Sequence, residues 1–304
     1  MRCILSLILA IALLTGCAAP NAAAADTPED SAAPSTAAAE LSEAGAAPGT
    51  AAADLPEDST APSTAAAELS EDSAAWKLSD FEPALCEAEA GEERYAIAGG
   101  TEWENTVVVR RGVEEGPAIY IVGGIHGDET AGWAAADLLK ELCPRAGTVY
   151  ILSPANVYGA EHDKRTTRSD RDLNRCFPGD PEGWDAERIA ATIYEDVEER
   201  SPDLLLDLHE TKGPQESAPE RDDLRNTVIV YDMAPVGDLV WELTVEGDLT
   251  LMGSPPAGSI NRTVSEQLGI PAITLETWRG EALRERVERQ IRFVREVLTF
   301  YGML

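Results

Sequence analysis

The sequence contains no long hydrophobic run and few basic residues. No apolar stretch reaches the roughly 20 residues that a helix needs to span a bilayer, which excludes a polytopic membrane protein. The 304 residues carry 24 Lys and Arg against 55 Asp and Glu, a formal net charge of −31. Nucleic-acid binders need cations to displace counterions from phosphate, and anionic lipid surfaces attract basic patches. The charge balance therefore argues against both kinds of partner.

The first 17 residues have the pattern of a lipoprotein signal peptide. Arg2 gives a positive start, an apolar run covers residues 4–14, and Gly16 precedes Cys17. This end of the chain resembles the bacterial lipobox, in which cleavage occurs before the cysteine and the thiol is lipidated. We expect an exported protein that acyl chains on Cys17 hold at the bacterial membrane, outside the cytoplasm.

Residues 18–75 have the composition of a disordered linker. They are rich in Ala, Pro, Ser, Thr, Asp and Glu, with no Lys, Arg or aromatic residue. Residues 26–43 recur almost unchanged as residues 54–71, which indicates a duplicated linker because neither copy holds enough apolar side chains for a core. Low hydrophobicity and charge of one sign favour an extended, disordered chain. The folded domain is expected over residues 76–304.

From residue 76 onward, strand patterns alternate with helix patterns. The expected strands cover 105–110, 118–122, 148–152, 204–208, 227–231 and 272–275, and the expected helices cover 130–142, 186–200 and 281–298. This alternation predicts an α/β fold whose central sheet is mostly parallel or mixed, with helices on both faces. In such sheets the functional site lies at the carboxyl ends of the strands.

Two of the three histidines follow predicted strands. His126 and Glu129 stand three apart at a glycine-rich turn after the strand 118–122, and His209 ends the strand 204–208. Imidazole and carboxylate at this spacing can face one Zn²⁺. Taken singly, the carboxylate could merely begin a helix and the histidine could merely pack in the core. Two histidines at strand ends, in a chain with only three, favour a metal site.

Two further segments carry charge where a site is expected. Glu276 ends the last predicted strand, where a carboxylate could instead cap the next helix. Residues 164–175 hold five cations within an acidic chain, most of which would ordinarily be solvated. Arg175 follows Asn174 in a loop, and a guanidinium can bind a carboxylate through two parallel hydrogen bonds. Arg175 is therefore a candidate for binding an anionic group.

Four motifs in a fixed order resemble the zinc carboxypeptidase clan, and within it the succinylglutamate desuccinylase/aspartoacylase family. They are GGIHGDE, RSDRDLNRCFPG, DLHE and ITLET. The resemblance implies a zinc carboxypeptidase-like fold. It also implies that His126, Glu129 and His209 bind one Zn²⁺ per chain, with a coordination position left open. His162 is not expected as a fourth ligand, because it would close that position.

The resemblance assigns roles to residues around the metal. Asn174 and Arg175 would bind the carboxylate of the substrate. Asp172 would orient the first histidine ligand. Glu276 would act as general base and then as general acid.

Two departures from the family pattern leave alternatives open. Arg168 matches the arginine that polarises the scissile carbonyl, but the gap to DLNR is one residue shorter than in aspartoacylases, so Arg165 or Arg171 could be the equivalent. Aspartoacylases also carry a further β-domain after the catalytic glutamate, whereas 28 residues follow Glu276 here. A cleft without that domain would admit longer peptides.

Together these patterns predict a surface-anchored, zinc-dependent amidohydrolase. It would use a zinc-activated water to cut the amide bond of a carboxylate-bearing N-acyl amino acid or peptide. A metallocarboxypeptidase that trims peptides, such as cell-wall stem peptides, is the alternative within this class. A non-catalytic lipoprotein that binds carboxylates is the alternative outside it, and the complete ligand set together with Glu276 argues against that reading.

The cysteines outside the signal and lipidation site are Cys86, Cys143 and Cys176, an odd number. A disulfide between Cys86 and Cys143 is left open by the sequence. Cys176 could be a free thiol near the pocket, but it is not expected to be a nucleophile because no histidine is left to activate it except His162.

Overall fold

The computed structural model describes residues 76–212, 226–245 and 249–304. All of them belong to one compact unit, Ser59–Leu304. The expected signal peptide, Cys17 and the linker lie outside the described residues, so those expectations stay predictions. None of the described helices combines the length and the hydrophobicity that crossing a membrane requires.

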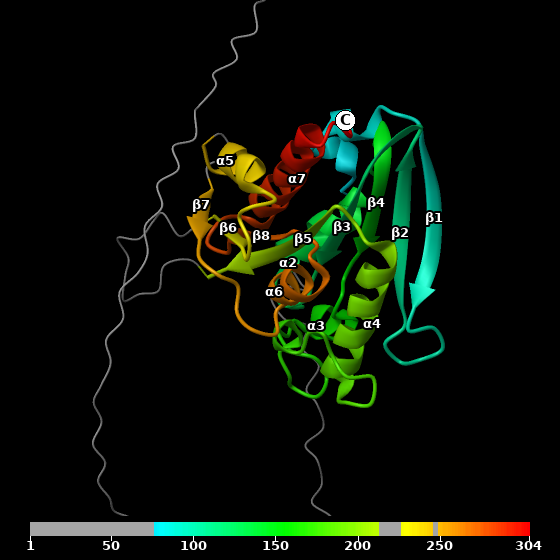
Figure 1. Cartoon of the computed structure of the whole chain (residues 1–304), viewed down its shortest axis with the longest axis vertical. Coiled ribbons are helices and arrows are strands. Elements are labelled where there is room, and N and C mark those ends of the chain that lie inside the picture. Colours follow the sequence, from blue (N-terminus) through cyan, green and yellow to red (C-terminus); the bar gives the residue numbers. More distant parts are fainter. Residues whose placement is uncertain (1–75, 213–225, 246–248) are drawn as a thin grey trace, which may run out of the picture. The chain divides into compact units, whose positions relative to one another are not determined.

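A single mixed sheet occupies the centre of the described part of the chain. Its strands are β1 (Ala90–Ile97), β2 (Asn105–Gly112), β3 (Glu114–Gly123), β4 (Ala146–Leu152), β5 (Leu204–Thr211), β6 (Thr227–Val230), β7 (Thr250–Met252) and β8 (Ala272–Trp278). Their spatial order is β1-β2-β4-β3-β5-β8-β6-β7, and β1 and β7 lie at opposite edges (Figure 1).

The four central strands β4, β3, β5 and β8 run parallel, whereas β2 pairs antiparallel with β4, and β6 with β8. The predicted α/β class with a mixed sheet is therefore confirmed.

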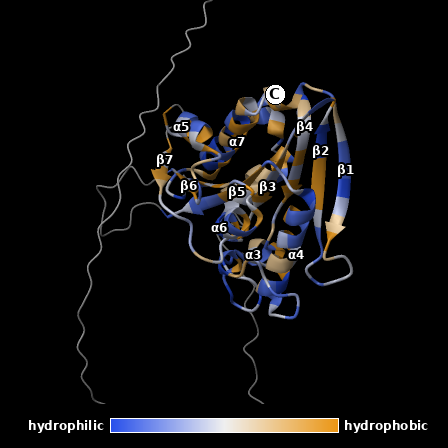
Figure 2. Ribbon diagram, viewed as in Figure 1, coloured by the Kyte–Doolittle hydropathy of each residue, from blue (hydrophilic) through white to orange (hydrophobic). Residues whose placement is uncertain are grey.

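Helices cover both faces of the sheet. They are α2 (Thr130–Leu139), α3 (Val157–His162), α4 (Asp185–Arg200), α5 (Gly237–Val245), α6 (Ile260–Thr263) and α7 (Leu283–Phe300). Successive side chains of a strand point to opposite faces. Accordingly, Ile119 and Ile121 pack with α2, α5 and α7, whereas Tyr120 and Val122 pack with α4 and α6. Hydrophobic residues mark β2 and β3 in Figure 2, as expected for strands that are buried on both faces.

Helix α7 closes the chain against the sheet. Val287, Ile291, Val294 and Leu298 recur at helical spacing and are fully buried, as the apolar stripe predicts. Helix α2 makes the closest approach to the sheet. A Cβ atom on Gly132 would lie 2.5 Å from the carbonyl oxygen of Leu208 on β5, so only glycine fits there. This approach brings the start of α2 next to the end of β5.

Three cysteines of the described chain, Cys86, Cys143 and Cys176, are free thiols. The amide of Cys143 donates to the carbonyl of Leu85 over 2.7 Å, so the backbone places Cys86 and Cys143 close together without a bond between them. The thiol of Cys176 donates to the backbone carbonyl of Asp172 over 3.3 Å.

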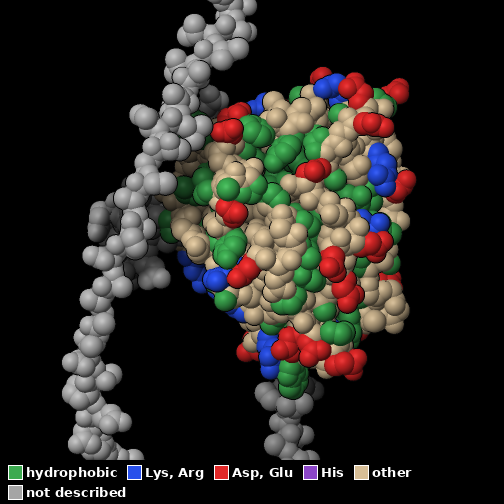
Figure 3. All heavy atoms as spheres, viewed as in Figure 1, with side chains coloured by type: hydrophobic (Ala, Val, Ile, Leu, Met, Phe, Trp, Pro, Cys, Tyr) green, Lys and Arg blue, Asp and Glu red, His purple; other side chains and the backbone are tan. Residues whose placement is uncertain are grey.

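Acidic side chains are more frequent than basic ones on the visible face of the molecule (Figure 3). On the face shown in Figure 3, Asp and Glu outnumber Lys and Arg, in keeping with the net charge of −31. Because most surface charges are negative, cations that line a pocket are candidates for binding an anionic group.

Candidate metal centre and active site

The candidate site lies at the carboxyl ends of three neighbouring parallel strands. His126 and Glu129 occupy the turn between β3 and α2, His209 lies near the end of β5, and Glu276 lies on β8. The register of β5 against β8 pairs His209 directly with Glu276. Parallel pairing therefore brings together residues that are up to 150 positions apart in the sequence.

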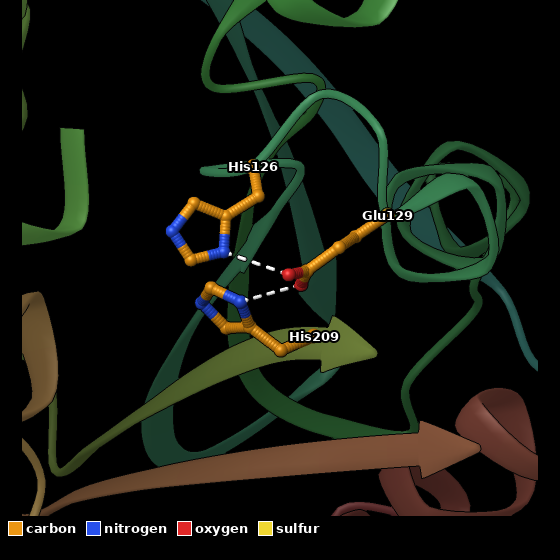
Figure 4. A group of neighbouring side chains, drawn as sticks. All are labelled: His126, Glu129 and His209. Carbon is orange, nitrogen blue, oxygen red and sulfur yellow. Dashed lines mark hydrogen bonds and ion pairs between the residues drawn. The ribbon is translucent and has the colours of Figure 1, made fainter. Parts of the chain in front are cut away.

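His126, Glu129 and His209 form a buried group that fits a metal ion. Each offers one ligand atom, and these atoms lie within 4.8 Å of one another. Each imidazole points its Nδ1 at one oxygen of the carboxylate, His126 at 2.8 Å from Oε1 and His209 at 2.7 Å from Oε2 (Figure 4). Two imidazoles and one carboxylate are the donor set of a catalytic zinc site. His162 stacks on Tyr158 instead, at 4.2 Å between ring centroids.

The opposite nitrogen of each imidazole faces a second carboxylate. Asp172 Oδ1 lies 2.9 Å from Nε2 of His126, and Asp207 Oδ1 lies 2.8 Å from Nε2 of His209. A carboxylate at Nε2 orients each ring so that Nδ1 faces the centre of the group, where a metal ion would displace any proton that Nδ1 carries. Both histidines are therefore oriented as metal ligands require.

Glu129 and His209 stabilise each other's charged forms. Burial would favour a neutral Glu129, but His209 and His126 hold the pKa of its carboxyl well below the usual range. Burial would also favour a neutral His209, but Asp207 and Glu129 hold the pKa of its imidazole well above the usual value. The buried carboxylate is thus stabilised as an anion, which is the form that binds a cation.

Glu276 differs from these groups in its environment. Burial, which is the largest effect, raises the pKa of its carboxyl, and the nearby carboxylates of Glu129 and Asp207 raise it further, against the opposing effect of His209. A carboxyl group whose pKa is raised toward neutrality is suited to accept and return a proton. The structure therefore places a candidate base beside the candidate metal centre.

A pocket of about 430 Å³ is lined by six of the predicted site residues, but not by Arg168 or Asp172. His126, Glu129, His209, Asn174, Arg175 and Glu276 all line it. Asn174 is held in place because its Oδ1 accepts a hydrogen bond from the amide of Ile260 over 3.0 Å. The guanidinium of Arg175 donates to the backbone carbonyl of Asn174 over 2.8 Å, and its charge helps to lower the pKa of the Asp172 carboxyl.

Of the three candidate arginines, the structure places Arg165 in this pocket. Its NH1 lies 3.1 Å from Glu129 Oε1, and its NH2 lies 3.1 Å from Asp172 Oδ2. Arg168 instead lies over the ring of Tyr158, at 5.2 Å from its centroid, and lines a separate pocket of about 200 Å³. Arg171 pairs with Glu187 over 3.4 Å.

The loop itself explains this difference. The side chain of Thr167 is buried between Arg165 and Arg168 and contacts Asp185 of α4 over 3.1 Å. The backbone turns there, since the amide of Thr167 donates to the carbonyl of Arg171. Arg165 and Arg168 line different pockets, and Arg168, the first choice from the sequence, does not line the pocket of the candidate metal centre.

Three polar residues around the metal centre were not predicted. Asp207 precedes His209 by two positions, so strand alternation puts both on one face. Arg279 lines the pocket, donates to Asp128 over 3.1 Å and lies 3.8 Å from Glu129 Oε1. Glu210 donates its backbone amide to Glu129 Oε2 over 2.9 Å. The DxH spacing could have revealed Asp207, and Glu210 stands in the DLHE motif itself, whereas Arg279 carries no comparable signal.

The sheet topology and the strand-end site define a carboxypeptidase-like α/β protein. A family model described as the succinylglutamate desuccinylase/aspartoacylase catalytic domain matches residues 115–301. The chain belongs to this family. The expectation drawn from the four motifs is thereby confirmed.

One sequence relative and two solved structures illustrate the relationship. The chain is 39% identical over 109 residues to an N-alpha-acetyl-L-2,4-diaminobutyric acid deacetylase of Halomonas elongata, a match that covers 34% of this chain and 30% of that protein. A succinylglutamate desuccinylase/aspartoacylase from Rhodobacter sphaeroides superposes with a TM-score of 0.55 at 22% identity, covering 71% of this chain and 66% of that one.

A metallo-carboxypeptidase from Burkholderia cenocepacia has a TM-score of 0.51 at 14% identity, covering 73% of this chain and 67% of the other. These structural likenesses show a shared fold. The chain spans less than a third of the sequence relative and about two thirds of both solved structures.

Proposed function

We propose that the protein is a zinc-dependent hydrolase that cuts the amide bond of an N-acyl amino acid with a free carboxylate. The convergence of His126, Glu129 and His209 in one pocket with Glu276 is the observation that carries this proposal. Membership of a family named for a desuccinylase and an aspartoacylase supports the reaction type. The similarity to a deacetylase of an acetylated amino acid supports the substrate class.

The donor set fits zinc, with His126, Glu129 and His209 as ligands. Bound zinc would supply Lewis-acid polarisation of the amide carbonyl and would lower the pKa of water to about 7. Glu276 lies where it can take a proton from the attacking water and return it to the leaving amine. Its raised pKa matches both halves of that task.

Arg165 takes the place of Arg168 in this proposal. Its guanidinium lines the pocket and reaches the metal-ligand carboxylate, so it can also donate to the carbonyl oxygen as negative charge develops there. Arg175 and Asn174 bind the carboxylate of the substrate, because both line the pocket and a guanidinium there can donate two parallel hydrogen bonds to a carboxylate.

A carboxypeptidase acting on peptides is the second candidate. The fold shared with a metallo-carboxypeptidase favours it, and Arg175 could equally hold the C-terminal carboxylate of a peptide. The two activities share the metal centre and differ in what lies on the acyl side of the scissile bond.

A panel of N-acyl amino acids and of short peptides separates the candidates. We expect amine release from N-acyl amino acids by the purified protein, loss of that release after chelation, and its return on adding zinc. Faster release of the C-terminal residue from peptides would favour the second candidate. Binding of carboxylates without turnover of any substrate would favour the non-catalytic lipoprotein.

We also propose that Cys17 carries a lipid anchor and that the domain acts outside the cytoplasm. The apolar run followed by Gly16 and Cys17 supports this proposal. Cells fed a labelled fatty acid should label the wild-type protein and not a Cys17→Ser variant. Equal labelling of both proteins would contradict the anchor.

A further inference from the structure

Glu210 is a buried acid that the proposed reaction does not use. It follows His209 on β5, and because alternate strand residues point to opposite faces, its side chain points away from that of His209, although Glu210 also borders the pocket. That side chain has no exposed surface. An unpaired carboxylate that is fully buried would strongly destabilise the fold. The partners of Glu210 therefore explain how its carboxylate can be buried there.

The first partner of Glu210 is the start of helix α2. Glu129 is the N-cap residue of α2, yet its side chain makes no capping hydrogen bond, because both of its oxygens face the two histidines. Oε2 of Glu210 instead accepts a hydrogen bond from the amide of Ala131 over 2.9 Å. Glu210 thus supplies from β5 the cap that an N-cap side chain ordinarily provides.

A second hydrogen bond joins the same two segments in the opposite direction. The backbone amide of Glu210 donates to Oε2 of Glu129 over 2.9 Å. The carboxylate of Glu129 is therefore fixed by β5, and the helix that carries Glu129 is fixed by the side chain from β5. Together the two bonds set the position of one metal ligand relative to the strand that carries another, His209.

The second partner is Arg286 of helix α7, whose NH1 contacts Oε1 of Glu210. One turn later on the same helix, Gln290 donates to the carbonyl oxygen of His209 over 2.7 Å. Arg286 is 9% exposed and Gln290 is fully buried. Helix α7 thus holds the side chain of Glu210 and the backbone of His209 at adjacent points along β5.

We propose that Glu210, held by Arg286, is a positioning residue that sets the geometry of the metal ligands Glu129 and His209. This inference rests on the proposed function, since it assumes that the group binds zinc. A buried ion pair can often be replaced by apolar residues without loss of stability. The ion pair of Glu210 with Arg286 is instead explained by the positions that it imposes on Glu129 and His209.

Zinc affinity, measured by competition with a chelator, tests the proposal without relying on turnover. We expect Glu210→Gln to weaken zinc binding about 10- to 100-fold, the range found when groups that orient metal ligands are changed. The matched control is Glu281→Gln. It removes an ion pair of 3.0 Å between Glu281 and Arg289 of α7, and neither residue lines the pocket. The control should bind zinc as the wild type does.

A double substitution separates positioning from stability. Replacing both partners, Glu210→Met with Arg286→Met, removes the buried charges and should keep the melting temperature near that of the wild type. We expect its zinc affinity to stay weakened, because no carboxylate then caps α2. Wild-type zinc affinity in this double variant would show that the ion pair is merely structural and would overturn the proposal.

The outcomes also distinguish this inference from the proposed function. A wild-type protein that binds no zinc overturns both. Normal zinc binding by the wild type and unchanged affinity in Glu210→Gln overturn the inference alone. If Glu210→Gln does not fold, Arg286→Lys keeps a cation beside Glu210, and a smaller weakening in the same direction is expected; unchanged affinity in that variant would count against the proposal.

Discussion

Asp172 Oδ1 lies 2.9 Å from Nε2 of His126, on the side of the imidazole that faces away from Glu129. Burial opposes a charged Asp172, but the hydrogen bond from His126 and the nearby guanidinium of Arg165 hold the pKa of its carboxyl well below the usual range. Asp172 therefore faces His126 as an anion and keeps the Nε2 proton in place. The orientation of His126 depends on this charge.

Removing that charge should weaken metal binding. We expect Asp172→Asn to lower zinc affinity about 10- to 100-fold, because the imidazole loses the partner that directs its Nδ1 lone pair. Competition with a chelator measures this. The control is Asp170→Asn in the same loop, where the exposed carboxylate accepts from Thr166 over 2.9 Å and is not part of the pocket lining. Equal affinity of Asp172→Asn and the wild type would show that His126 needs no orienting anion.

Removing the candidate base should separate metal binding from turnover. Glu276→Gln keeps the size of the side chain but cannot accept the proton, so we expect kcat to fall about 100- to 10,000-fold. Zinc content should stay near that of the wild type, because Glu276 is not among the predicted ligands. Glu266→Gln, which changes an exposed acid paired with Arg262, is the control. Retained turnover in Glu276→Gln would remove Glu276 from the mechanism.

The two loop arginines should differ in their effects on catalysis. We expect Arg165→Met to lower kcat/KM about 100- to 1,000-fold, because a donor to the developing oxyanion is lost. Arg168→Met should stay close to the wild type, since its guanidinium lies over Tyr158 and lines another pocket. Zinc content is measured in both variants, because Arg165 also contacts Glu129. The reverse order of effects would restore Arg168 as the catalytic arginine.

Zinc should stabilise the fold through its ligands. A ligand that binds only the native state at 100 times its Kd adds about 2.7 kcal/mol to the free energy of unfolding. We therefore expect chelation to lower the melting temperature of the wild type and added zinc to restore it. In His126→Ala, which lacks one ligand, zinc should leave the melting temperature unchanged. A zinc-dependent rise in that variant equal to the wild-type rise would contradict the assigned ligands.

Asp185 should make the stability of the arginine loop depend on pH. Burial opposes its charged form, but hydrogen bonds from Ser169, Thr167 and Ala186 hold the pKa of its carboxyl below the usual value. A lowered native pKa contributes stability above the unfolded pKa of about 3.9, and this stability is lost as the pH falls through the native pKa.

Thermal unfolding of Asp185→Asn tests this dependence. At pH 7 we expect the variant to be less stable than the wild type by about 1 to 2 kcal/mol, the cost of weakening hydrogen bonds to a charged group. The difference in unfolding free energy between the variant and the wild type should narrow as the pH falls below about 4. It should be lost once Asp185 of the wild type becomes neutral, below its lowered native pKa. A gap that is constant down to pH 2 would show that the charge of Asp185 does not stabilise the loop.

Much of the fold could be predicted from hydrophobic pattern. The inner strands β3, β5 and β8 contain apolar segments that are buried on both faces, and α7 forms close to the predicted helix 281–298. Strand β1 was missed because it is an edge strand whose residues are mostly exposed, so its sequence AGEERYAI lacks alternation. The short strand β7 at the opposite edge was missed for the same reason.

The sequence by itself determined the chemistry of this protein: which side chains can bind a metal and that they follow buried strands. Tertiary structure alone decided which of them meet. The register of β5 on β8 pairs His209 with Glu276, and the contact of Thr167 with Asp185 directs Arg165, and not Arg168, to the pocket. Side-chain direction at a strand end or in a loop depends on partners far along the chain, and local pattern carries no information about such partners.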